Sequence, residues 1–154
     1  MRVSKATFDA IVAAGGRPQG AAWDALGVAA AEPFWLLPAS PQEGLPWFGL
    51  STEGIPPGLQ LVDGAVRFDF TITSGPDLAQ FSSYAVDPFG APSFHLSTTD
   101  GLMGYSRPTG VHEHMNWTFS AAGWWTVEVV ISAEETRGAI FTSAPAPLRF
   151  YVEP

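Results

Sequence analysis

Proline and glycine limit the length of every element that this chain can form, because both residues recur throughout it. The 154 residues include 14 prolines and 16 glycines. Proline lacks the amide hydrogen that helices and central strands need, and glycine favours turns. Short strands joined by turns are therefore expected over most of the chain. The sequence contains no cysteine, so packing rather than disulfide bonds has to hold the core.

Alternating hydrophobicity marks the best-defined strand. Val66, Phe68, Phe70 and Ile72 alternate with polar residues, which is the pattern of a strand with one buried face. Further strands are predicted at 79–86, 93–97, 125–131 and 148–152. Six or seven short strands separated by turns indicate an all-β fold, an antiparallel β-sandwich of the immunoglobulin-like or jelly-roll-like kind. A single closed barrel is the structural alternative.

The first 33 residues differ in composition from the rest and are predicted to form an N-terminal arm. Ser4–Ala14 has the pattern of a short helix that Gly15 and Gly16 would end. Phe8 and Ile11 would share one face of this helix and are candidate interface residues. Residues 17–33 are interpreted as a linker with one more helical turn, and the sandwich is expected to span 34–154.

Charge excludes two classes of partner. The net charge is −8, and the chain has only seven lysines and arginines. Such a chain offers no basic surface for phosphates, so neither nucleic acid nor an anionic membrane surface is an expected partner. No apolar run approaches the roughly 20 residues that cross a bilayer, so membrane insertion is not expected either.

The motifs of common enzyme classes are missing from the sequence. It contains no Gly-x-Ser-x-Gly elbow, no phosphate-binding glycine loop followed by lysine, and no dinucleotide fingerprint. Aspartates such as Asp77, Asp87 and Asp100 lie beside glycine or proline, which is typical of turns. We therefore expect a protein that is not an enzyme and that needs no cofactor.

One segment resembles a known family. Residues 112–119 read His-Glu-His-Met-Asn-Trp-Thr-Phe, and Gly123-Trp124 follows. This order is similar to the signature of the actinobacterial surface-anchored protein repeat, also called the choice-of-anchor M domain. The likeness extends back through Leu45-Pro-Trp-Phe-Gly49 and Phe34-Trp-Leu-Leu-Pro38, and so covers about residues 34–153. Within the motif, Asn116, Trp117, Phe119 and Gly123 are expected to be structural.

The resemblance implies a module of exported, wall-linked proteins, some of them associated with metal transport, and it implies no enzymatic activity. This chain has one copy of the module, no continuous apolar signal segment, and no sorting sequence after Val152. A virion-associated assembly, or one made in the cytoplasm, is therefore favoured over an exported cell-surface location. Capsid decoration or phage attachment would be a role of that kind, by analogy of fold.

A His-x-His pair is the candidate metal site. His112 and His114 are two residues apart and would leave one face of a strand together, with His95 as a third ligand for zinc or copper. Glu113 would point to the opposite face. The alternative is that these histidines make structural hydrogen bonds, and the sequence favours it, because a closed zinc site has four ligands and the chain has only three histidines.

Aromatic residues supply the candidate interface. Trp124 and Trp125 are adjacent, so they must face opposite sides of a strand, and an outward Trp124 would be an interface anchor. Trp47 is a second candidate, and Trp35, Trp47, Trp124 and Phe48 together could form a platform for carbohydrate or a partner protein, with a place in the core as the alternative. Asn116-Trp117-Thr118 is formally a glycosylation acceptor, but a buried hydrogen-bonding amide is the favoured interpretation of Asn116.

These observations favour a structural or interaction module of a larger surface assembly. Its expected partners are proteins, either copies of itself or a larger scaffold. A metal-binding module for zinc or copper and a carbohydrate-binding module are the two alternatives.

Overall fold

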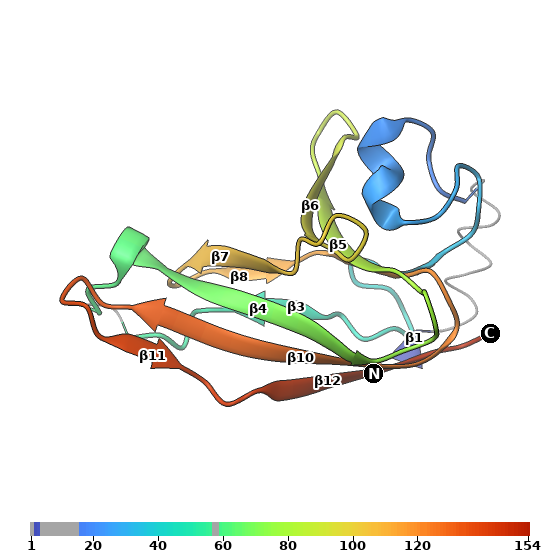
Figure 1. The fold of residues 1–154 in the computed structure, drawn as a ribbon. Coiled ribbons are helices and arrows are strands. Elements are labelled where there is room, and N and C mark those ends of the chain that lie inside the picture. The colour runs from blue at the N-terminus through green and yellow to red at the C-terminus, as the bar shows by residue number, and fades with distance from the viewer. Residues whose placement is uncertain (1, 4–15, 57–58) are drawn as a thin grey trace.

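The computed structural model describes residues 2–3, 16–56 and 59–154. Within these residues the chain is an all-β sandwich (Figure 1), which confirms the predicted fold class. The larger sheet, sheet A, has the strand order β1-β12-β10-β4-β7, and β11 pairs with β10. Its strands are β1 (Arg2–Val3), β4 (Ala65–Ser74), β7 (Gly104–Pro108), β10 (Gly123–Glu134), β11 (Ile140–Thr142) and β12 (Ala146–Val152).

The opposing layer contains two smaller sheets, so the described strands form a sandwich and not one closed barrel. Sheet B has the order β2-β9-β5-β6, with strands β2 (Trp35–Leu37), β5 (Phe81–Val86), β6 (Pro92–Ser97) and β9 (Asn116–Phe119). Sheet C pairs β3 (Gly49–Ser51) with β8 (His112–His114). Two 3-10 helices complete the described elements, η1 (Ala21–Leu26) and η2 (Val62–Gly64). Neither helix of this described part of the chain has the length and apolar character needed to cross a membrane.

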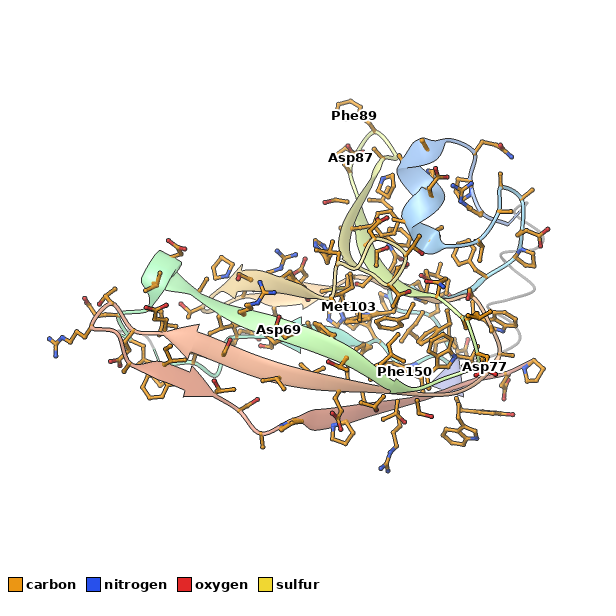
Figure 2. All side chains as sticks on the ribbon, in the orientation of Figure 1. Asp69, Asp77, Asp87, Phe89, Met103 and Phe150 are labelled. Carbon is orange, nitrogen blue, oxygen red and sulfur yellow. The ribbon has the colours of Figure 1, made fainter. Side chains whose placement is uncertain are left out.

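Period-two alternation builds the core from both layers. Along β4 and β10, alternate side chains such as Phe68, Phe70, Trp125 and Val127 are buried, while their neighbours face outward. Sheet B contributes Phe81, Trp117, Phe119 and other fully buried residues to the same cluster. Figure 2 shows Phe150 of β12 inside the sandwich, where it is completely buried, and Phe89 at the exposed tip of the β5–β6 hairpin.

The second half of the predicted arm covers the outer face of sheet B. Residues 17–33, interpreted from the sequence as a linker, contain η1 and pack on β5 and β6 through a cluster in which Leu26 joins Phe34 and Tyr84. Arg17 is buried there, pairs with Asp24 and donates to the carbonyl oxygen of Trp23 over 3.0 Å. The predicted helix at Ser4–Ala14, with Phe8 and Ile11, lies outside the described residues.

The two ends of the sandwich differ. β1 and the C-terminus lie at one end, and the turn between β10 and β11 lies at the other (Figure 1). β10 runs between them, so its first residues are close to the C-terminus and its last residues form the far end.

The adjacent tryptophans of β10 provide a test of this alternation. Trp125 is 1% exposed in the core, and Trp124 is 65% exposed on the other face. Trp125→Ala should lower the free energy of unfolding by about 3–5 kcal/mol, because it leaves a large cavity. Trp124→Ala should cost less than about 1.5 kcal/mol, since it removes one surface ring contact. Urea denaturation followed by circular dichroism measures both, and equal losses would contradict the assigned faces.

Candidate functional site

The residues of the His-x-His motif lie on β8, a short strand that pairs with β3 in sheet C. In register, Gly49 lies opposite His114 and Ser51 lies opposite His112. The two backbones approach closely, because a Cβ atom added at Gly49 would lie 2.5 Å from the carbonyl oxygen of Glu113 and 2.7 Å from Nδ1 of His114. Only glycine therefore fits opposite His114 in this arrangement.

One face of β8 carries a stack of three rings. The Trp47 indole lies on the His114 imidazole, with ring centroids 3.7 Å apart and planes 10° apart. His114 in turn stacks on His112 at 4.8 Å. Trp47 donates its indole N–H to the carbonyl oxygen of Ala39 over 2.7 Å, which fixes the top of the stack. At the other end, Nδ1 of His112 lies 3.0 Å from a carboxylate oxygen of Glu53.

The opposite face of β8 carries a polar cluster that the sequence analysis missed. Glu113 points there, as predicted, and forms a two-pronged ion pair with Arg107, which also lies over the Tyr105 ring at 4.7 Å. Nη2 of Arg107 lies 3.2 Å from each ring nitrogen of His95. Arg107 follows Tyr105 by two residues on β7, and this spacing, which places both on one face of a strand, was the available sequence signal.

Burial and charge set the titration of this polar cluster. Burial lowers the pKa of His95 below its usual range, the Arg107 guanidinium lowers it further, and Glu113 partly opposes both effects. Burial, followed by the Glu113 charge, raises the pKa of Tyr105 well above its usual range. His95 is therefore held in its neutral form at pH values where a free histidine would begin to gain a proton.

The three histidines do not come together. His112 and His114 share one face of β8, whereas His95 contacts Arg107 and Glu113 on the other. No group of three or more residues of the types His, Cys, Asp and Glu is placed to hold a metal ion in the described part of the chain. His112 instead pairs with Glu53, and both side chains are half-exposed.

The remaining motif residues have structural roles. Oδ1 of Asn116 accepts a hydrogen bond from the Ala39 N–H over 3.1 Å and so ties the end of β2 to β9. Trp117 and Phe119 are completely buried. Gly123 begins β10 with a φ of 132°, a backbone conformation that side chains rarely adopt.

The predicted aromatic platform is not assembled as one surface. Phe48 packs on Trp117 and Phe150 in the core, and Trp35 donates its indole N–H to the carbonyl oxygen of Glu153. Trp47 is 53% exposed but belongs to the ring stack on sheet C. Trp124 stands on sheet A, where its ring lies 4.9 Å from that of Tyr151. Of the predicted interface residues that the structure describes, Trp124 has the most exposed surface.

A second exposed apolar region was not predicted. It lies around β11 at the far end of sheet A, where Ile140 is 70% exposed and Phe141 is 54% exposed. Beside it is an open groove of about 490 Å³. β11 is only three residues long and lacks the alternation over 4–8 residues by which strands are recognised, so no strand was predicted there.

The chain was compared with known proteins. No protein-family model matches it, and no curated protein matches it at a significant level.

The lowered pKa of His95 predicts a pH dependence of stability. As the pH falls below about 6.5, the unfolded chain binds a proton at this histidine before the folded protein does, so folded stability decreases. Above that pH the contribution of His95 is complete. His95→Gln should therefore flatten the loss of stability between about pH 7 and pH 5, measured by urea denaturation. An unchanged slope would show that His95 titrates normally.

The hydrogen bond that the Asn116 amide accepts predicts that removing this side chain destabilises the fold. Asn116→Ala removes the acceptor for the Ala39 N–H and should lower the free energy of unfolding by about 1–3 kcal/mol. Asn116→Asp keeps an oxygen acceptor in the same place and is the matched variant. Urea denaturation at neutral pH compares them, and equal loss in both would show that the hydrogen bond is not the source.

Proposed function

We propose that this chain is a structural, non-catalytic module of a larger assembly, and that copies of it join through the open edge of sheet A at β11. The observation that carries the proposal is the state of this edge. β11 pairs with β10 on one side, and no described strand pairs with it on the other. An unpaired edge presents free backbone donors and acceptors, which are a template for another strand.

The side chains around this edge are apolar. The groove beside β11 lies between the loop that precedes η2 and the ends of β10 and β11. Ile131 and Leu59 are partly exposed there in addition to Ile140 and Phe141. Its lining includes Ile55, Pro56, Leu59, Leu61, Ile131 and Phe141. A partner strand on β11 would cover apolar surface as well as backbone, and this is the combination that stabilises strand addition.

Proline protects the neighbouring edge but not β11. Pro147 lies opposite Glu128 in the pairing of β12 with β10. Proline has no N–H to give to the ladder, so the nitrogen of Pro147, and by the period of two that of Pro145, faces the open side. These positions cannot donate to an incoming strand. β11 has neither proline nor charge, which are the residues that natural edges use against pairing.

The charge distribution favours a second copy as the partner. The whole chain carries a net charge of −8, but residues 138–148 contain no charged side chain. Two copies that meet at this segment avoid the direct opposition of like charges that most other contacts would create. A two-fold axis would set β11 antiparallel to its own copy and bring each Phe141 toward the partner's groove.

On this side of sheet A, a strand from the start of the chain is already added to the edge. β1 pairs in parallel with the end of β12, where Arg2 lies opposite Tyr151 and Val3 opposite Val152. The same edge of the sheet thus accepts a strand at one end of the molecule and presents an unpaired strand at the other.

The assembly role agrees with the resemblance to surface-anchored repeats, which we retain as part of the proposal. The resemblance is supported by the structural roles of the motif residues. Trp117 and Phe119 fill the core, and Asn116 joins β9 to the end of β2. A virion component and a cell-surface module both need contacts between modules, so the proposed edge would serve either setting.

Sedimentation velocity from about 1 µM to 1 mM tests the proposal, since weak specific contacts have dissociation constants in this range. The wild-type chain should form dimers as concentration rises. Phe141→Lys should remain monomeric, because it places a charge on the uncharged edge. Phe89→Lys is the matched control, since Phe89 is 95% exposed on the β5–β6 hairpin, away from β11.

A wild-type chain that stays monomeric over the whole range would overturn self-pairing at β11. Equal dimerisation of wild type and Phe141→Lys would place the contact elsewhere on the molecule. Circular dichroism of each variant confirms that the fold is kept.

A further inference from the structure

The outer face of sheet A carries a pair of aromatic rings at the end of the molecule opposite to β11. Trp124 and Tyr151 are cross-strand partners on β10 and β12. Their ring centroids are 4.9 Å apart and their planes meet at 37°. Trp124 is 65% exposed, so the pair presents a large aromatic surface to solvent.

Contacts within the protein account for the positions of other tryptophans but leave Trp124 on the surface. Trp35, Trp47 and Trp125 each donate the indole N–H to a backbone carbonyl oxygen. Trp117 is completely buried in the core. The ring of Trp124 contacts Tyr151, and most of the remaining indole surface faces solvent.

Polar side chains continue the same face next to the two rings. The next outward row pairs Thr126 with Arg149, and the row after that contains Glu128 with Thr71 of β4. Successive outward rows are about 6.8 Å apart, because side chains on one face of an antiparallel strand are two residues apart. Hydroxyl, guanidinium and carboxylate groups thus lie in a strip that begins at the aromatic pair.

This combination fits a carbohydrate. A pyranose ring has an apolar C–H face that stacks on an indole or phenol ring, and its hydroxyl groups bond to threonine, arginine and carboxylate side chains. The surface is the face of a sheet and not a concave pocket of the kind that encloses a small ligand. A run of several sugars lying along the face would reach both the rings and the polar strip.

The charge of the chain narrows the class of glycan. With a net charge of −8, the protein repels acidic polysaccharides. From this geometry and charge we infer that Trp124 and Tyr151 form a binding platform for a neutral polysaccharide, with Thr126 and Glu128 among the groups that bond to its hydroxyls. This site is on a different face from the proposed β11 contact and does not depend on it.

Affinity electrophoresis and titration calorimetry test the platform on the full chain. The probes are soluble neutral polymers, namely hydroxyethyl-cellulose, xyloglucan, galactomannan, laminarin and glycol chitin, with alginate as the acidic comparison. At least one neutral polymer should retard the wild-type chain, and alginate should not. Trp124→Ala should weaken binding at least about tenfold, as expected for a central aromatic anchor.

Matched variants separate the platform from other surfaces. Trp47→Ala removes the other half-exposed tryptophan, on sheet C, and should bind as wild type does. Tyr151→Phe should keep most of the affinity because it keeps the ring, whereas Tyr151→Ala should lose it. Phe141→Lys, which tests the β11 contact, should leave binding to a single short oligosaccharide such as cellohexaose or mannohexaose unchanged.

Two outcomes would overturn the inference. One is the absence of binding to every neutral polymer at about 5 mg/ml and to the hexasaccharides at about 5 mM, concentrations that reveal even millimolar affinity. The other is binding that Trp124→Ala leaves intact. Because Trp124 lies outside the core, its variant should remain folded, and circular dichroism checks this directly.

Discussion

The structure depends on one contact region, the aromatic cluster between the two layers. Trp117 of sheet B lies within 6.0 Å of the rings of Phe48, Phe70 and Phe81. Phe81 and Phe119 in turn reach Trp125 and Phe150 of sheet A. Without disulfides, this packing holds the two sheets together. The same cluster orients the candidate surfaces. Side chains alternate along β10 and β12, so each residue buried in the cluster leaves its neighbours in the strand on the outer face.

Several features could be predicted from the sequence because they arise from local periodicity. The alternation at 66–72 became β4, and the rule that adjacent residues face opposite sides placed Trp124 outward and Trp125 inward. The same rule put Glu113 on the opposite side of β8 from His112 and His114, where it pairs with Arg107. Periodicity is a property of a single strand, so it needs no knowledge of what the strand packs against.

Other features depend on the tertiary arrangement. His95 is 17 residues from His112 in sequence, and only the way that β6 and β7 meet decides that it contacts Arg107 and not the His-x-His pair. Residues 17–33 have no clear period, yet the apolar surface of Tyr84 and Phe94 gives Leu26 and Trp23 a place to pack. β11 forms because Ser132–Glu134 extend beyond the end of β12 and leave positions for Ile140–Thr142 to pair with.

The length of β10 has a consequence for how the module would act in pairs. Trp124 is the second residue of this strand and Glu134, beside β11, is the last. They are ten positions apart along the strand, a distance of about 34 Å. In a pair joined edge to edge at β11, the two-fold axis is perpendicular to the shared sheet, so both aromatic platforms would face the same way, on the order of 70 Å apart. Such a pair would be bivalent toward a long polymer or a coated surface and monovalent toward a short oligosaccharide, and its avidity would depend on the spacing of sites on the surface to which it attaches.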